Sequence, residues 1–384
     1  MDDQDLTEEQ VMLSQTTAKF IQSELPISKI RALHDHSFGS EGYSPEGFDR
    51  EWLGRTAELG WYSMLIPEEH GGGSITGHGL LDLTAIADSI GRYLQPGPFL
   101  STNVVASAIS HFGSPDQQKT LLAGIAAGEV VATWAPFGAA GEWDSGAGLE
   151  IVVDGDDILL RGSRGFVPDA AGADHILVTG RSEDLVLQVL VPASTPGVEI
   201  EPLISFDITR RLAAVSFDGA RLPVSAVLGG EIVSATAAVE HQLQTAIVLA
   251  CAEAVGALDA VFDMTVEYSK DRIAFGRPIG SFQALKHAMA DQLLHLESCK
   301  AAAVEAALAV DSGNDDAAEI VSMAAAYLDE YATRIVQQSL QIHGGIGFTW
   351  EHDLHLYMRR IRAVTSMWCE RAWHYDRIRE VCAL

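Results

Sequence analysis

The chain has 384 residues, a length that allows roughly two or three domains with substantial hydrophobic cores. Hydrophobic residues make up 47% and charged residues 20%, which is typical of a folded globular protein and excludes a disordered one. The 53 acidic and 25 basic residues give a formal net charge of −28. Such a surface repels phosphate backbones and anionic lipids, so we expect neither nucleic acid nor a membrane as a partner.

The ends and the cysteines carry no targeting or metal signal. Residues 1–5 are acidic and lack the cationic stretch and apolar run of a signal peptide. No apolar run reaches the roughly 18 residues that a membrane helix needs. Cys251, Cys299, Cys369 and Cys382 are scattered, without a CxxC pair. This pattern favours reduced thiols in a cytoplasmic protein, and we expect no metal site.

The first zone, residues 1–130, is predicted to be helical. Apolar residues recur at helix spacing in segments such as 80–90. Turns are marked by Pro67, by the glycines at 71–73 and by the Pro-Gly-Pro at 96–98. The zone therefore predicts an N-terminal helical domain.

The second and third zones differ sharply in pattern. Residues 131–231 hold short apolar runs rich in β-branched residues and separated by Gly, Asp and Pro, which predicts an antiparallel sandwich or barrel. Residues 232–384 are helical again, with long periodic stretches at 235–270, 283–311 and 315–341 that predict an antiparallel bundle. The predicted fold class is α+β, mostly α, in the order helical domain, β domain, helical bundle.

Two clusters lie at the ends of these long helices. In the first, at 272–283, Arg272 ends one helix and Gln283 opens the next, and a guanidinium at such a turn can bind a pyrophosphate with two hydrogen bonds. A helix hairpin with a capping arginine explains the same residues. In the second, at 341–348, glycines let a ligand approach the backbone closely, and a left-handed helix stop is the alternative.

Together the two clusters resemble the acyl-CoA dehydrogenase family, whose C-terminal bundle carries an Arg–Phe-Gly–Gln segment and a Gln–Gly-Gly–Gly segment. Further similar segments at 60–72, 91–98 and 191–198 extend the resemblance over nearly the whole chain. The resemblance implies a C-terminal four-helix bundle, bound FAD and α,β-desaturation of an acyl-CoA, with electrons passed to an acceptor. It also implies that six residues bind the FAD of a neighbouring subunit: Arg272, Phe275, Gln283, Gln341, Gly344 and Gly345.

The segments that the family uses on its own flavin ring are altered. Trp134 stands where the family has a Thr, and Ala135 stands where it has a Glu. Pro168 replaces a Thr that lies near the flavin ring, and proline supplies neither a hydroxyl nor a backbone N–H.

The general base of the family is also missing from its expected positions. Counting from Met358 places Trp368 at the usual position, and Ala246 stands at the alternative position on the first bundle helix. We therefore assign no catalytic residue. Glu370, two residues from the expected position, is a weak candidate, and a solvated carboxylate at a helix start is the favoured explanation.

The losses fall on one functional half of the flavin site and spare the other. The resemblance therefore implies the base-lacking subunit of a two-chain acyl-CoA dehydrogenase, paired with a homologous catalytic chain as α2β2. That branch handles bulky acyl-CoAs such as steroid side chains. Two alternatives stay open: a self-sufficient homo-oligomer that uses Glu370, and a flavin-free binding or scaffold protein. Two interpretations of the basic run at 359–362 also stay open. It forms a solvated face, or it lies near an anionic ligand or an acidic partner.

Overall fold

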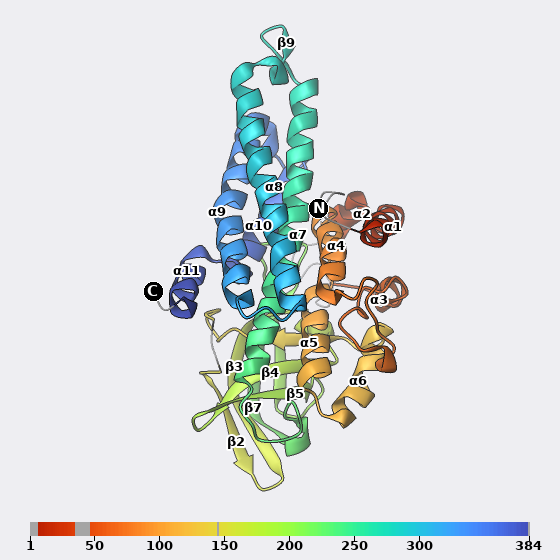
Figure 1. Cartoon of the computed structure of the whole chain (residues 1–384), viewed down its shortest axis with the longest axis vertical. Helices are drawn as coiled ribbons and strands as arrows, with labels where there is room; N and C mark the ends of the chain where they lie inside the picture. The colour runs from red at the N-terminus through yellow and green to blue at the C-terminus, as the bar shows by residue number, and fades with distance from the viewer. Residues whose placement is uncertain (1–6, 35–46, 144–145, 383–384) are drawn as a thin grey trace.

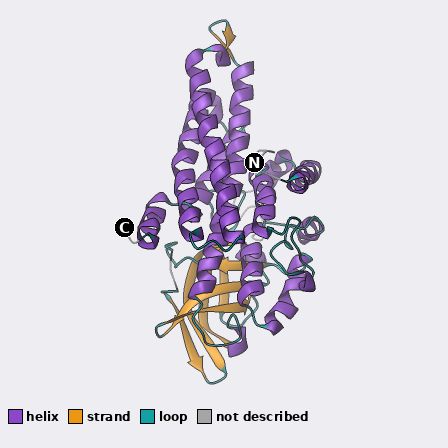
Figure 2. Ribbon diagram, viewed as in Figure 1, coloured by secondary structure: helices purple, strands orange, loops and turns teal. Residues whose placement is uncertain are grey.

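The computed structural model describes residues 7–34, 47–143 and 146–382, so the acidic stretch at 1–5 lies outside the described residues. An upright bundle of long helices stands on a curled sheet, and shorter helices pack along one side (Figures 1 and 2). The expected order of helical, β and helical regions is confirmed.

The N-terminal helices begin at residues suited to that role. The side chains of Thr7 and Ser114 each accept a hydrogen bond from the backbone N–H of a glutamine three residues later. The side-chain oxygen of that glutamine in turn accepts a hydrogen bond from the backbone N–H of Thr7 or Ser114. Pro115 follows Ser114 at the start of its helix. The region comprises α1 (Glu8–Glu24), α2 (Ile27–His34), α3 (Arg50–Ala57), η1 (Glu68–His70), α4 (Gly79–Arg92), α5 (Phe99–Phe112) and α6 (Pro115–Ala126).

The middle region forms one seven-stranded sheet in the described part of the chain, with the order β1-β4-β2-β3-β7-β6 and with β5 paired to β4. Most pairs are antiparallel, as expected, but β1 runs parallel to β4, and Glu150 of β2 pairs in parallel with Arg181. The strands are β1 (Ala132–Ala135), β2 (Leu149–Asp154), β3 (Asp157–Pro168), β4 (His175–Ser182), β5 (Leu185–Pro192), β6 (Val198–Leu203) and β7 (Leu212–Pro223), with the short turns η2 (Ala170–Gly172) and η3 (Val224–Ala226).

The C-terminal region is the predicted antiparallel bundle. Each long periodic stretch appears as a helix within two residues of its expected ends. The elements are α7 (Thr236–Asp271), β8 (Ile273–Ala274), β9 (Arg277–Pro278), η4 (Ile279–Ser281), α8 (Gln283–Asp311), α9 (Ala317–His343), η5 (Gly344–Phe348), α10 (Leu354–Trp368) and α11 (Arg371–Val381). The β8–β9 hairpin stands at the end of the bundle farthest from the sheet (Figure 1).

Helix α7 is the core helix of the bundle. By length and composition alone it could cross a membrane, which the sequence analysis did not expect of any segment, but 83% of its most apolar window is buried inside the protein. Two glycines let it approach α4 closely. A Cβ on Gly91 would lie 1.8 Å from the carbonyl oxygen of Glu253, and one on Gly256 would lie 1.9 Å from that of Asp88. The two helices therefore meet backbone to backbone.

A buried charge network joins all three regions. Arg360 of α10 pairs with Asp207, in the loop before β7, at 2.6 Å and with Glu253 of α7 at 2.9 Å. Its guanidinium also donates to the carbonyl oxygen of Gln95 at 3.3 Å. Arg210 adds a second cation on Glu253, at 2.5 Å. Because each charge has a charged partner and further hydrogen bonds, the network holds the sheet, the N-terminal helices and the bundle in one arrangement.

Candidate functional site

The first predicted cluster lies at the hairpin end of the bundle. The backbone N–H of Arg272 donates to the carbonyl oxygen of Tyr268 at 2.9 Å, and its own carbonyl accepts from Ile279 at 2.8 Å, so the hairpin is fixed on the end of α7. The Arg272 side chain is exposed, and its guanidinium has no hydrogen bond or ion pair with any described residue. It does not cap its own helix by its side chain, which leaves all its donors for a ligand.

The second cluster lies beside the first because two rings join them. His343, the last residue of α9, stacks on Tyr268 of α7 with ring centroids 4.6 Å apart and an interplanar angle of 18°. Burial lowers the pKa of His343, although its hydrogen bond with the backbone carbonyl of Ser339 opposes the shift. His343 therefore packs beside the glycine turn, and a neutral ring is the form this packing favours.

The glycine turn itself is open. Gly344 has φ 63° and ψ −142°, a conformation that favours glycine, and a Cβ on Gly344 or Gly345 would meet nothing within 4 Å. Gln341 and Gln283 are both exposed, and the Gln283 amide lies 3.4 Å from His287. Open backbone and free donors on two adjacent turns fit an extended anionic ligand such as a pyrophosphate.

Large apolar side chains are exposed around these turns. Phe275 is 96% exposed at the tip of the hairpin, with φ 53°, and Phe348 is 71% exposed in η5. Ile273, Ile346 and Trp350 are also exposed. Two segments, 273–275 and 346–350, present these residues, and exposed apolar side chains of this size are typical of a protein interface. This end of the bundle therefore combines donors for an anion with a surface that suits a second chain.

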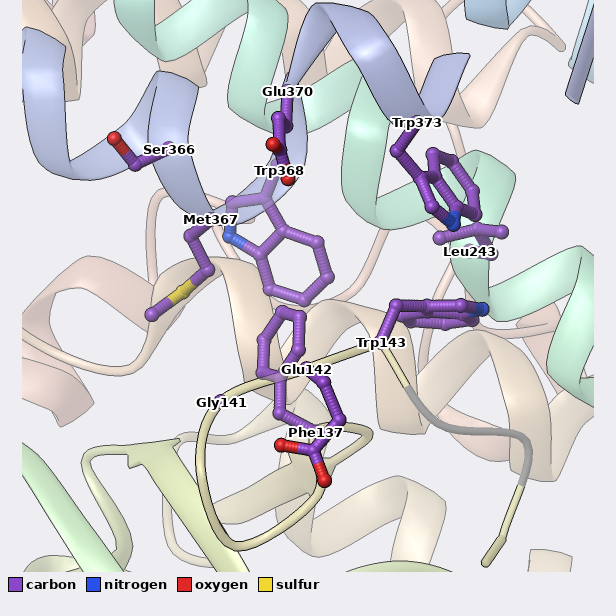
Figure 3. Close-up of a pocket in the computed structure, with 10 residues that line it drawn as sticks. All are labelled: Phe137, Gly141, Glu142, Trp143, Leu243, Ser366, Met367, Trp368, Glu370 and Trp373. Carbon is purple, nitrogen blue, oxygen red and sulfur yellow. The ribbon is translucent and has the colours of Figure 1, made fainter. Parts of the chain in front are cut away.

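The altered segments meet at the other end of the bundle, where the sheet begins. Trp134 of β1 stacks on Trp368 at the end of α10, with ring centroids 6.0 Å apart and an interplanar angle of 16°. Phe137 packs against the same indole at 5.2 Å (Figure 3). Sequence comparison assigned Trp134 to a flavin-contact position and Trp368 to the base position. The two substitutions are therefore in contact and fill the space between them.

No carboxylate occupies the two base positions. Trp368 is buried, and Ala246 is fully buried in the core face of α7. Glu370 is exposed at the start of α11, and its carboxylate forms no hydrogen bond or ion pair with any described residue. The buried indole ring of Trp368 stands at the aligned base position, and the sequence interpretation of Glu370 as a solvated helix-start carboxylate agrees with its exposure.

Pro168 ends β3 and accepts a hydrogen bond at its carbonyl oxygen from the hydroxyl of Thr133, at 2.5 Å. The next residue, Asp169, lies with Pro168 and Trp368 at a small cavity of about 60 Å³. Burial raises the pKa of Asp169 to about 6, although Arg210 opposes the shift. Sequence reasoning missed this carboxyl, since only the fold buries it and brings arginines beside it.

The basic run at 359–362 divides in the structure. Arg360 is buried in the charge network, while Arg362 is exposed and lies 3.4 Å from Asp329. Arg359 stacks its guanidinium on the ring of Phe206, 5.1 Å from the centroid. The run is therefore not a continuous cationic patch. Arg360 lies at helix spacing from the buried apolar residues of α10, and this spacing was the signal that could have distinguished it from the other two arginines of the run.

Comparison with known proteins agrees with this architecture. Residues 7–129 match the family model of the acyl-CoA dehydrogenase N-terminal domain, and residues 236–368 match that of the acyl-CoA dehydrogenase C-terminal domain. The acyl-CoA dehydrogenase IpdE2 of Mycolicibacterium smegmatis is 31% identical over 355 residues, which cover 92% of this chain and 93% of that protein.

Two solved structures of two-chain enzymes are also similar. The steroid ACAD Tcur3481–Tcur3483 is 26% identical with a TM-score of 0.86, and the ChsE4–ChsE5 complex from Mycobacterium tuberculosis is 25% identical with a TM-score of 0.87. Each match covers 98% of this chain and 98% of the other. The chain therefore belongs to the acyl-CoA dehydrogenase family, an oxidoreductase family whose cofactor is FAD.

Proposed function

We propose that this chain is the non-catalytic subunit of a two-chain acyl-CoA dehydrogenase. It supplies the pyrophosphate side of an FAD site to a homologous catalytic subunit and binds no flavin ring of its own. The contrast between the free guanidinium of Arg272 and the stacked pair Trp134–Trp368 carries the proposal. In this proposal, the half-site that serves the neighbouring subunit is open at Arg272, and the two indoles occupy the half that would hold the chain's own flavin ring.

The residues at the hairpin end have separate roles in this proposal. The Arg272 guanidinium donates to the pyrophosphate with two hydrogen bonds, and the open backbone at Gly344 and Gly345 lets the dinucleotide approach. Gln283 and Gln341 donate to its polar groups, and Phe275 packs against the second chain. When bound, FAD would supply the hydride acceptor for the acyl-CoA. A base of the partner subunit would remove the proton.

The comparisons support the choice of partner and substrate. Two similar structures are named as complexes of two chains, and one of them is named as a steroid ACAD. We infer an α2β2 assembly in the cytoplasm that desaturates a bulky acyl-CoA of the steroid side-chain class and passes electrons to a separate acceptor. In this proposal the chain has three domains: an N-terminal helical domain at 1–130, a middle β domain at 131–231 and a C-terminal helical bundle at 232–384.

Expression of the chain by itself and with homologous partner chains tests the proposal. We expect the lone chain to purify nearly colourless, with negligible desaturase activity. The co-purified complex should show flavin absorbance and activity, at two FAD per α2β2 tetramer. FAD bound stoichiometrically to the lone chain, with turnover, would favour the homo-oligomer that uses Glu370. A protein that stays colourless with every homologous partner would favour the scaffold alternative.

A further inference from the structure

A second cavity lies beside the Trp134–Trp368 stack and has no part in the proposed function. It measures about 330 Å³ and lies between the loop after β1 and the junction of α10 with α11 (Figure 3). Small-molecule pockets span roughly 300–1,000 Å³, so a small ligand fits. The walls are mainly aromatic, and they come from Phe137, Trp143, Trp368 and Trp373.

The four rings form a connected set. Phe137 contacts Trp143 at 6.0 Å and Trp368 at 5.2 Å between ring centroids. Trp143 in turn contacts Trp373 at 5.7 Å, with an interplanar angle of 62°. The rings tilt against one another, by 80° for Phe137 with Trp143 and by 52° for Phe137 with Trp368. Ring faces carry the negative part of the aromatic quadrupole and attract cations.

The charged groups at the cavity have the same sign. Glu142 and Glu370 line it, and no Lys, Arg or His is among the described residues that line it. The Glu142 carboxylate accepts one hydrogen bond, from the backbone N–H of Ala140 at 3.1 Å. The Glu370 carboxylate has no partner among the described residues. The negative end of α10 and the positive end of α11 meet here and offset each other, so the two carboxylates set the charge.

The nearest contact between a cation and this aromatic set lies on Trp373. The guanidinium carbon of Arg377 stands 5.4 Å from the Trp373 ring centroid, and the same guanidinium pairs with Glu240. Arg377 does not line the cavity. The side chains of the described residues therefore leave the cavity without a cation.

From this geometry we infer that the cavity binds a small organic cation, of the methylated ammonium class. A trimethylammonium group offers apolar methyl groups to the indoles and a diffuse positive charge to Glu370. An acyl-CoA phosphate or a carboxylate ligand would instead face two carboxylates without a compensating cation. The inference does not rest on the proposed function, because it uses neither FAD nor Arg272.

Calorimetric titration of the full-length chain, in the assembly in which it is isolated, tests the inference. The probes are choline and its neutral isostere 3,3-dimethylbutan-1-ol, which share shape but differ in charge. We expect choline to bind with quenching of tryptophan fluorescence, and the neutral alcohol to bind roughly 5- to 30-fold more weakly. Equal binding of both probes, or binding of neither, would overturn the inference.

Matched variants locate the site. Trp373→Leu and Glu370→Gln should each weaken choline binding at least about fivefold. Tyr375→Leu and Glu380→Gln are the controls, because they remove an exposed ring and an exposed charge from the same helix without lining the cavity. These controls should retain full affinity. If Trp373→Leu fails to fold, Glu370→Gln still decides, since that carboxylate has no structural partner. Choline affinity unchanged in Glu370→Gln would contradict a cation site.

Discussion

Arg360 donates from Nε to the carboxylate of Asp207 at 2.6 Å, although 153 residues separate the two and both side chains are fully buried. Burial opposes ionisation of Asp207, but the charge of Arg360 lowers its pKa overall. A pair of this kind contributes little net stability against an apolar replacement, but removal of one partner leaves the other charge buried and unpaired. The relationship therefore ties the bundle to the loop before β7.

Arg360→Leu should lower the free energy of unfolding by about 3–5 kcal/mol, because Asp207 would stay buried without its cation and Glu253 would keep only Arg210. Urea unfolding measures the change. Arg362→Leu, two residues along α10, removes a half-exposed contact with Asp329 and should cost at most about 1 kcal/mol. Equal effects of the two variants would contradict the central role of the buried network.

Arg272→Ala should weaken FAD retention by the assembled complex roughly 10- to 150-fold, the range for loss of a charged hydrogen-bond pair. Arg272→Lys should recover part of this, because an ammonium lacks the planar fork of a guanidinium. The measurement is FAD content of the purified complex beside its subunit ratio. Arg277→Ala is the matched control in the same hairpin, since its guanidinium stacks on Phe282 at 4.1 Å. Unchanged FAD content in an intact Arg272→Ala complex would contradict the shared site.

Gly256→Ala should destabilise the protein by about 1–3 kcal/mol or more, because the new Cβ would overlap the carbonyl oxygen of Asp88 and force α4 and α7 apart. Gly54→Ala provides the contrast. Gly54 lies within α3 with nothing near its missing Cβ, so alanine there should stabilise the protein by about 0.5–1 kcal/mol. Thermal and urea midpoints of both variants check the pair, and a neutral Gly256→Ala would show that the helices separate easily.

Stability should fall as the pH is lowered from about 6.5 to about 4, because two histidines are held neutral in the folded protein. Burial lowers the pKa of His241 to about 4, with a further contribution from His111, and burial lowers the pKa of His374 to about 4. Between about 4 and 6.5 the unfolded chain binds more protons than the folded one, so acid favours unfolding. Each group contributes at most about 3 kcal/mol of stability, which is lost across this pH range.

Urea midpoints measured across this pH range check the histidine prediction. His374→Gln should flatten the dependence, because Gln does not titrate. His78→Gln, which replaces an exposed histidine, should leave the slope unchanged. A slope that persists in His374→Gln and in His241→Gln would assign the pH dependence to carboxyl groups instead.

The spacing of apolar residues along the chain predicted most of the architecture. It predicted α7, α8 and α9 within two residues of their ends, because the apolar residues of a long helix recur at helix spacing. The β zone was recognised from its short runs and turn residues, but the parallel pairing of β1 with β4 was not. Strands 132–135 and 175–182 are separated along the chain by β2 and β3, so no local signal specifies their direction.

The sequence by itself determined the family resemblance, the glycine turn at 341–348 and the absence of a carboxylate at the aligned base positions, since each depends on residue identity at a given spacing. Tertiary structure alone decided what the substitutions do together. It stacked Trp134 on Trp368, separated Arg360 from the solvated arginines beside it, and raised the pKa of Asp169 through burial. Contact, burial and electrostatic environment depend on residues far apart along the chain, and the fold fixes those distances.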